Sequence, residues 1–511
     1  MSNSVNKGPL VFSLRLAVPL PSPSDKTADT DRLLQALSAA GYNNVSIPLD
    51  IARRLPPELR KNELLKDELL KDDCELALAM GPGERGLKVL DIGERRIYGI
   101  ALDIGSTTLE ASLFDLADGK KIDEKSAGNP QAAFGADVLT RVQLSMMGEY
   151  KKIARLLTDG VNRLIVDLCG ANDISADNIF ALTVAGNTIV SHFFLGLEVN
   201  NIPVSPYVPA VNKPMICSAG ETGTAINKNA VVYVFPNSGS YVGGDIISGI
   251  LYCGIHREES PVLFVDVGTN VEITLGCRDW LMVGAGAAGP ALEGGIAHIG
   301  KRAEPGTISR VKIDKAGHEI KLDVISDIEP AGICGSGLID LISEMFSAGV
   351  IDQAGRFTEN AGRIVETDGV KAYLLHKSDQ TELFLTEPEI KNFLLSKAAM
   401  FSFLYVFVRS VGLTFGDIGK IYVAGALGCG INPISAINIG MLPDVPLERF
   451  VQLGNSSLRG AEMLLLNRDL LSEIDGIAAM ITYREMNEDS ELMSILQGAM
   501  FIPHTDPLML K

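Results

Sequence analysis

Short apolar runs alternate with longer amphipathic stretches along most of the chain. Stretches 27–40 and 150–169 place apolar residues three and four positions apart, which is typical of helices buried on one side. Apolar-rich runs of four to seven residues, typical of buried strands, lie at 11–17, 97–102, 109–114, 180–184, 262–265 and 421–424. Strands that alternate with helices in this way predict an α/β fold.

The first 98 residues predict a small α/β domain. After the first strand and helix, we expect further strands at 44–47, 76–80 and 87–92. Residues 56–74 alternate leucine with charged residues, which indicates an exposed helix or helical linker. No group of residues in this region has the pattern of a catalytic site.

A strand–turn–strand pattern begins after Arg96. The strand at 97–102 leads into the turn Asp103–Thr108, and a second strand returns at 109–114. The result is a hairpin whose tight turn contains a carboxylate, a glycine and three hydroxyls.

The same pattern recurs later in the chain, where the strand 262–265 leads into the turn Asp266–Asn270 and a returning strand. Asp103 and Asp266 are 163 residues apart (266 − 103), which indicates an internal repeat of domain size. We therefore expect two related lobes, at 99–258 and 259–511, behind the small domain.

Both turns combine residues that suit a bound phosphate. A glycine lets the backbone approach a phosphate closely, and backbone N–H groups and hydroxyls then donate to its oxygens. Asp103 and Asp266 carry the wrong charge to contact phosphate, so we expect them to bind Mg²⁺ directly or through water. One such turn is more often an ordinary hairpin, whereas two turns that face each other across a cleft would bind the β- and γ-phosphates of ATP. The predicted phosphate contacts are Gly105, Ser106, Thr107, Thr108, Gly268, Thr269 and Asn270.

A third glycine motif follows the strand at 421–424. Gly425 and Ala426 would let an adenosine lie flat against the end of that strand. Asp245 follows two glycines and precedes an apolar helical run, which is the pattern of a helix N-cap. The sequence contains no Walker motif G-x-x-x-x-G-K-[ST] and no G-x-G-x-x-G that opens a helix after a strand, so neither of those nucleotide sites is expected.

Composition narrows the class of protein. The formal net charge of −18 argues against non-specific binding of nucleic acid or of an anionic membrane. The seven cysteines are scattered and include no Cys-x-x-Cys pair, so no iron–sulfur cluster is expected in this chain. The apolar run 398–408 is shorter than the ~20 residues of a membrane span and predicts a buried core helix. Scattered thiols and the absence of a secretory signal favour the cytoplasm.

The order of two phosphate turns followed by an adenosine turn resembles the actin-like ATPase superfamily, which includes sugar kinases and Hsp70. That resemblance implies duplicated lobes of the ribonuclease H-like fold. In the sugar-kinase branch an Asp at a place similar to Asp245 is the general base. The resemblance therefore implies catalytic roles for Asp103, Asp266 and Asp245, with Asp245 acting as base, as helix cap, or as both.

Several longer strings resemble a narrower family, the ATP-dependent reductive activators of corrinoid enzymes. They are YGIALDIGSTTLEASLFDLADGK (98–120), NPQAAFGADVLTR (129–141), TVAGNTIVSHFFLG (183–196), YVGGDIISG (241–249), AGPALEGGIAHIG (288–300) and ICGSGLIDLI (333–342). The resemblance covers residues 99–511 closely. Residues 1–98 are more loosely similar to the small middle domain of those activators.

This resemblance implies a function, which is to return the cobalt of a corrinoid methyltransferase protein from Co(II) to Co(I) at the expense of ATP and with Mg²⁺. Family members usually carry a ferredoxin-like domain, and this sequence shows none. We therefore expect a piece of a longer protein, a separate low-potential electron donor, or ATP-driven remodelling alone, and we favour the separate donor. The implied partners are a corrinoid protein and that donor, with no nucleic acid and no membrane. A homodimer is expected because family members tend to dimerise.

Two other functions stay open on the sequence alone. A small-molecule kinase of the same fold would need an acceptor pocket beside Asp245, and a nucleotide-binding scaffold would show no turnover. We expect Asn187 and His192 to be structural, and Arg141 to contact a phosphate, a partner or a surface carboxylate. Cys334 lies in a glycine-rich turn and is assigned no role.

Overall fold

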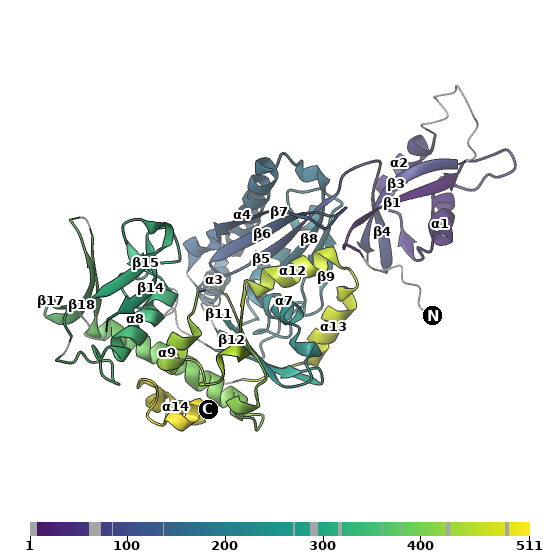
Figure 1. The fold of residues 1–511 in the computed structure, drawn as a ribbon. Coiled ribbons are helices and arrows are strands. Elements are labelled where there is room, and N and C mark those ends of the chain that lie inside the picture. The colour runs from purple at the N-terminus through teal and green to yellow at the C-terminus, as the bar shows by residue number, and fades with distance from the viewer. Residues whose placement is uncertain are drawn as a thin grey trace. The chain divides into compact units, whose positions relative to one another are not determined.

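The computed structural model describes residues 8–60, 73–83, 85–135, 137–268, 271–286, 295–314, 319–359, 361–379, 381–425, 430–485 and 490–511 (Figure 1). Contacts divide the chain into two compact units. Unit 1 comprises Met1–Tyr252 and Ser457–Ala479, and unit 2 comprises Cys253–Ser456 and Met480–Lys511. Residues 457–479 therefore pack with the N-terminal half of the chain although they come late in the sequence.

The N-terminal part of unit 1 is a four-stranded sheet with two helices, drawn in purple in Figure 1. In sheet order its strands are β1 (Phe12–Pro19), β3 (Asp73–Gly83), β4 (Gly86–Ile92) and β2 (Val45–Ser46). Strands β1, β3 and β4 pair antiparallel, and β2 pairs parallel to β4. Helix α1 (Asp29–Ala39) buries Leu33 and Leu37, as its apolar spacing predicts.

The sequence analysis did not predict the first part of helix α2 (Leu49–Leu59), which continues through two consecutive prolines. An apolar stripe at intervals of four residues stabilises it against the sheet, and this stripe consists of Ile51, Leu55 and Leu59. The predicted helix at 56–74 overlaps the end of α2, which stops at Leu59, and it is wrong at its own end, where β3 starts at Asp73. Residues 61–72 lie outside the described residues.

The rest of unit 1, called here the first lobe, is built on a six-stranded sheet in the order β7-β6-β5-β8-β10-β9. Its strands are β5 (Tyr98–Ile104), β6 (Thr108–Asp115), β7 (Lys121–Gly128), β8 (Ile179–Gly186), β9 (Met215–Ser218) and β10 (Val231–Val234). Its α-helices are α3 (Val138–Leu144), α4 (Tyr150–Ala171), α5 (Thr188–Leu195), α6 (Ala219–Thr222), α7 (Gly244–Cys253), α12 (Ser456–Leu466) and α13 (Leu470–Met480). In Figure 1 the yellow α12 lies beside the teal α7, where Gly460 packs against Ser248.

Unit 2, called here the second lobe, is built on a six-stranded sheet in the order β21-β20-β11-β12-β13-β22. These strands are β11 (Val262–Val267), β12 (Val271–Cys277), β13 (Trp280–Gly286), β20 (Ile421–Ala424), β21 (Phe450–Gly454) and β22 (Ile481–Tyr483). Two three-stranded sheets follow, formed by β14 (Thr307–Ile313), β15 (Ile320–Val324) and β16 (Gly332–Ile333), and by β17 (Ile364–Thr367), β18 (Val370–Lys377) and β19 (Glu382–Thr386). The α-helices are α8 (Gly335–Ser347), α9 (Glu387–Arg409), α11 (Pro433–Asn438) and α14 (Ser490–Ala499).

The two large sheets repeat one topology. The order β7-β6-β5-β8-β10 of the first lobe corresponds to β13-β12-β11-β20-β21 of the second. In both sheets the first three strands of this order pair antiparallel. The third strand, β5 or β11, then pairs parallel to the fourth, β8 or β20. The expected duplicated α/β fold of the actin-like type is therefore confirmed.

Helix α9 is the long apolar helix of the second lobe, and it is the one described helix whose length and composition would allow a membrane crossing. Two thirds (67%) of its most apolar window is buried inside the protein, which confirms the predicted core helix at 398–408. Lys397 of this helix is fully buried. Its ammonium donates to the carbonyl oxygens of Ala499 at 2.6 Å, Phe501 at 2.8 Å and Pro503 at 2.6 Å.

These three bonds use every proton of the Lys397 ammonium. Burial lowers the pKa of Lys397 to about 7, whereas three carbonyl acceptors favour the charged form. The carbonyls belong to the end of α14 and to the segment after it, so Lys397 stabilises the C-terminal segment against α9.

We expect Lys397→Met to loosen the C-terminal segment, because three buried carbonyls lose their donor. The cost should be about 3 kcal/mol, which corresponds to roughly hundredfold faster amide exchange. Hydrogen–deuterium exchange of a peptide spanning 495–511 measures this change. Lys391→Met is the matched control, because Lys391 lies exposed on the same helix and forms a surface ion pair with Glu387. Equal exchange in the two variants would contradict the role of Lys397.

Candidate functional site

The first predicted phosphate turn connects β5 to β6. The N–H of Gly105 donates to the carbonyl of Thr108 at 2.9 Å and closes the turn. A Cβ added at Gly105 would lie 2.8 Å from the same carbonyl oxygen, so this position requires glycine. Gly105, Ser106, Thr107 and Thr108 are half-buried at the carboxyl end of β5.

Two buried side chains bind the carbonyl oxygens of this turn. Asn129 donates from Nδ2 to Gly105 at 2.9 Å and from its backbone N–H to Thr107 at 2.8 Å. Arg141 donates from Nη2 to Ser106 at 2.6 Å. Because a trans peptide directs its C=O and N–H to opposite sides, the N–H groups that follow these carbonyls point away from Asn129 and Arg141. Backbone N–H groups at a turn of this kind suit an anion such as phosphate.

Arg141 lies in the interior, whereas the sequence analysis allowed a surface carboxylate among its contacts. Its side chain is fully buried, and it also donates from Nε to the carbonyl of Gly135 at 3.0 Å. Asn129, which sequence reasoning missed, is 2% exposed. Both residues lie in the string 129–141 that the family resemblance singled out, and that resemblance was the one signal available for them.

Asp103 is the last residue but one of β5. It lies opposite Glu110 of β6 and beside Ala185 of β8. Its Oδ1 accepts a hydrogen bond of 2.7 Å from the hydroxyl of Ser457, near the start of α12. A half-buried carboxylate whose orientation is fixed by a hydroxyl fits the expected role of binding Mg²⁺.

Asp245 lies in the first turn of α7 and not at the N-cap position, because the helix begins at Gly244. Its Oδ1 accepts the N–H of Ile246 at 2.9 Å. Burial nevertheless raises the pKa of Asp245 to about 6. A carboxyl with this pKa is suited to take a proton from water near neutral pH.

Glycines bring the start of α7 close to the end of β8. A Cβ at Gly243 would lie 2.7 Å from the backbone N of Thr188, and one at Gly244 would lie 2.6 Å from Cβ of Phe235. Since β8 also pairs with β5, the Asp103 turn and the Asp245 turn belong to the same end of the first-lobe sheet. The structure thus brings together two of the three candidate catalytic carboxylates in the first lobe.

Asn187 and His192 are structural, as predicted. Asn187 caps α5 by accepting the N–H of Val190 at 3.0 Å. The buried His192 contacts the carbonyl of Thr188 through Nδ1 at 2.7 Å, and its Nε2 accepts the N–H of Ala210 at 3.1 Å. This pattern assigns the neutral ring with its proton on Nδ1.

The second phosphate turn and the third glycine motif meet in the second lobe. Asp266 near the end of β11 lies beside Ala424 of β20, and Gly425 follows directly. Gly425 has a φ of +83°, and a Cβ there would lie 2.5 Å from the carbonyl oxygen of Val267 and against the carboxylate of Asp266. Glycine is therefore required at 425 for conformation and for space. Gly268 follows β11, while the predicted contacts Thr269, Asn270 and Ala426 lie outside the described residues.

The third motif is itself part of the repeat, which the sequence analysis missed. Val184-Ala185-Gly186 at the end of β8 corresponds to Val423-Ala424-Gly425 at the end of β20. Ala185 lies beside Asp103 just as Ala424 lies beside Asp266. The tripeptide Val-Ala-Gly, which occurs at both strand ends, could have indicated this repeat in the sequence.

The glycine-rich turn at 332–337 adjoins this part of the second lobe. Cys334 is the N-cap residue of α8 and is 5% exposed, with its Sγ 3.2 Å from the hydroxyl of Ser336. A Cβ at Gly430 would lie 3.0 Å from the same hydroxyl. Cys334 is therefore a packed side chain between two glycine motifs.

In the part of the chain that the structure describes, no group of three or more His, Cys, Asp or Glu side chains is arranged to bind a metal ion. This finding is compatible with an Mg²⁺ that accompanies a nucleotide. Such an ion usually takes one or two protein carboxylates and completes its shell with water and phosphate oxygens.

Comparisons with known proteins cover nearly the whole chain. Residues 3–65, 98–258 and 260–511 match the RACo linker region, the RACo middle region and the C-terminal domain of RACo, described as the ASKHA domain. A solved structure titled reductive activator for corrinoid, iron–sulfur protein is 34% identical, with a TM-score of 0.89 over 99% of this chain and 81% of that chain.

Two curated proteins are also similar. The corrinoid activation enzyme RamQ of Eubacterium limosum is 28% identical over 424 residues, which are 80% of this chain and 71% of that enzyme. The [Co(II) methylated amine-specific corrinoid protein] reductase of Methanosarcina barkeri is 24% identical over 418 residues, which are 76% of this chain and 73% of that protein.

These matches correct one detail of the sequence interpretation. The N-terminal part was compared to the middle domain of the activators, but residues 3–65 match the linker region. The middle region is 98–258, which contains most of the first lobe. Both parts are α/β in pattern, so periodicity and composition could not tell them apart.

We expect Gly425→Ala to destabilise the second lobe by about 3 kcal/mol, because it combines an unfavourable φ with overlap of backbone and carboxylate. Gly412→Ala is the matched control: Gly412 has a φ of +77° and nothing within 4 Å of an added Cβ. It should cost only about 1 kcal/mol. Urea unfolding followed by the fluorescence of Trp280, the single tryptophan and a residue of β13, measures the difference. Similar costs for the two variants would show that the Asp266 contact is not tight.

Proposed function

The chain belongs to the RACo family of reductive activators of corrinoid proteins, and on that premise we propose that it couples ATP to the reduction of a corrinoid protein from Co(II) to Co(I). The observation that carries the proposal is the repeated aspartate–glycine turn, found at the equivalent strand end of both lobes. Relatives named as a corrinoid activation enzyme and a Co(II) corrinoid protein reductase supply the substrate class.

ATP is needed because the reduction is unfavourable. For one electron, every 59 mV against the donor costs about 1.4 kcal/mol, so a gap of about 300 mV costs about 7 kcal/mol. A nucleotide supplies such energy only if its states bind the Co(II) partner with different affinities. The function therefore requires ATP turnover as well as ATP binding.

The residues of the two turns have distinct proposed roles. The N–H groups after Gly105 and Gly268, with the hydroxyls of the first turn, bind phosphate oxygens. Asp103 and Asp266 would bind Mg²⁺, an ion that neutralises phosphate charge when it is bound. Thr269 and Asn270 complete the second turn in this proposal.

Asp245 is the proposed base. It would orient a water molecule and take its proton as that water attacks the γ-phosphate, which releases ADP and phosphate. Gly425 and Ala426 would contact the adenosine, because a strand end without a large side chain accepts a flat ring. Backbone packing around Gly243 and Gly244 supports a defined place for Asp245.

The proposed partners follow from the same family membership. A corrinoid protein of a methyltransferase system is the substrate, and a separate low-potential protein donates the electron. We further propose that the protein acts as a homodimer in the cytoplasm, without nucleic acid or membrane, which agrees with its net charge of −18.

The decisive test is a visible-absorbance assay of cobalt. Purified protein is mixed with a Co(II) corrinoid protein and a low-potential reductant, with or without ATP. We expect Co(I) to form only with ATP, and we expect Asp103→Ala and Asp266→Ala to slow its formation at least hundredfold. Asp118→Ala is the control, because Asp118 is an exposed turn residue whose Oδ1 accepts the nearby N–H of Lys120. ATP hydrolysis without any Co(I) would instead indicate a kinase or a remodelling ATPase.

The pH dependence of ATP hydrolysis tests the proposed base. The deprotonated carboxylate of Asp245 is the active form, so the rate should fall about tenfold for each pH unit below about 6 and level off above it. Asp245→Asn should reduce the rate and abolish this dependence. Steady-state phosphate release between pH 5 and 8 provides the measurement, and a wild-type rate that is flat through pH 6 would exclude Asp245 as the base.

A further inference from the structure

Ser457 is in contact with the elements that carry both candidate carboxylates of the first lobe. Its hydroxyl donates to Oδ1 of Asp103 at 2.7 Å. Its backbone carbonyl accepts a hydrogen bond of 2.7 Å from the hydroxyl of Ser248, three residues after Asp245 on α7. Ser457 is 5% exposed and Ser248 is fully buried, so both bonds lie inside the protein.

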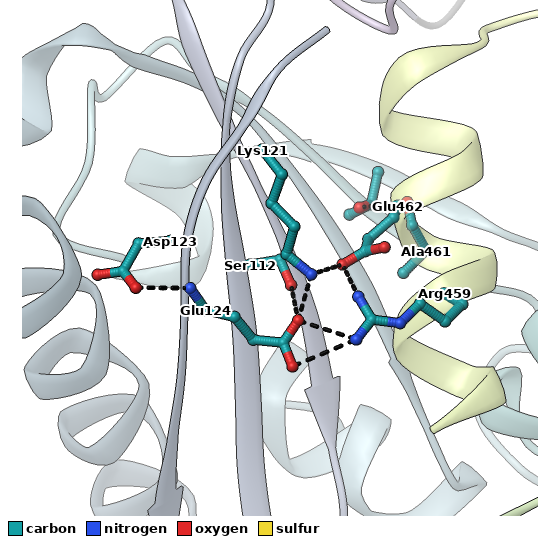
Figure 2. Close-up of polar contacts among 8 residues, drawn as sticks. Ser112, Lys121, Asp123, Glu124, Arg459, Ala461 and Glu462 are labelled. Atoms are coloured by element: carbon teal, nitrogen blue, oxygen red, sulfur yellow. Dashed lines mark hydrogen bonds and ion pairs between the residues drawn. The ribbon is translucent and has the colours of Figure 1, made fainter. Parts of the chain in front are cut away.

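Helix α12 is fixed to the sheet by contacts that do not involve the Ser457 hydroxyl. Figure 2 shows Arg459 and Glu462 of α12 beside Lys121 and Glu124 of β7. Arg459 pairs with Glu124 at 2.9 Å and with Glu462 at 2.5 Å, and Lys121 pairs with Glu462 at 2.9 Å and also with Glu124. Two positive and two negative charges thus form a closed, neutral ring.

Backbone contacts add to this ring of charges. The buried hydroxyl of Thr183 on β8 donates to the carbonyl of Ala461 at 2.9 Å. A Cβ added at Gly460 would overlap the backbone of Ser248, so α12 and α7 approach without an intervening side chain. The position of Ser457 is therefore set by its neighbours on α12, and removal of its hydroxyl should leave the helix in place.

We propose that Ser457 is a positioning residue for Asp103 in the binding of Mg²⁺–ATP. This inference rests on the proposed function and adds the residue that orients one of its metal-binding carboxylates. A carboxylate that accepts a hydrogen bond from a fixed hydroxyl has a restricted rotation. Mg²⁺ demands near-ideal geometry of its oxygen ligands, so the orientation of the carboxylate controls affinity for the ion. Groups that orient a metal ligand typically change metal affinity by about 10–100-fold.

The chain offers a matched pair of serines for the test. Ser456 precedes Ser457 and is 1% exposed, yet its Oγ has no hydrogen-bond partner among the residues that the structure describes. Ser457→Ala and Ser456→Ala therefore remove the same group from adjacent buried positions. Ser457→Thr keeps a hydroxyl and serves as the rescue variant.

Calorimetric titration with ATP, in the presence and absence of Mg²⁺, measures the metal-dependent part of the affinity. We expect Ser457→Ala to weaken ATP binding in Mg²⁺ about tenfold and to leave metal-free ATP binding and the melting temperature unchanged. Ser456→Ala should match the wild type, and Ser457→Thr should recover most of the lost affinity. The half-saturating Mg²⁺ concentration for ATP hydrolysis should rise in Ser457→Ala by a similar factor.

Other results of this titration would contradict either the positioning role of Ser457 or the proposed function. Wild-type affinity of Ser457→Ala in Mg²⁺, or an equal loss with and without Mg²⁺, would overturn the positioning role while the proposed function stands. Failure of Ser457→Thr to recover affinity would overturn it as well. A wild-type protein that binds ATP equally well with and without Mg²⁺ would exclude a metal role for Asp103, and one that binds no ATP would overturn the proposed function itself.

Discussion

The absence of a side chain at two equivalent glycines is the constraint on which both lobes depend. Gly186 ends β8 and Gly425 follows β20, each beside the hairpin that carries an aspartate. A Cβ at Gly186 would lie 2.9 Å from the carbonyl of Ile104, and one at Gly425 would lie 2.5 Å from the carbonyl of Val267. Both distances are well below ordinary van der Waals contact, so any larger residue would displace a hairpin. The positions of Asp103 and Asp266 thus follow from backbone packing between neighbouring parallel strands.

The first turn is also fixed before any ligand binds. Burial of the Arg141 guanidinium is unfavourable by itself, and the carbonyls of Ser106 and Gly135 offset that cost. Asn129 binds the remaining two carbonyls of the turn in the same way. Because these acceptors are occupied inside the protein, the turn need not reorganise when an anion approaches the opposite side. Such pre-organisation is the main source of strong electrostatic binding in a protein site.

Much of the fold could be predicted from the sequence, because the strands of both lobes are short apolar runs that end in recognisable turns. The strands around Asp103 and Asp266, helix α4 and the buried helix α9 all lie where periodicity places them. The first part of helix α2 was not predicted, because it depends on burial of one apolar stripe against the sheet. The roles of Asn129, Arg141 and Ser457 were equally inaccessible, because they depend on contacts between residues 24 to 354 positions apart. A pattern predicts which turn would bind phosphate, but only the folded chain shows which distant side chains fix that turn.

A short stretch of the chain joins the elements that hold the two aspartates. Strand β21 of unit 2 ends at Gly454, and α12 begins at Ser456 with only Asn455 between them. The chain therefore passes from β21 to the hydroxyl that contacts Asp103 within three residues. Strand β21 also pairs with β20, whose end places Gly425 against Asp266. Residues 454–457 therefore join the strand pair beside Asp266 to the hydroxyl that contacts Asp103.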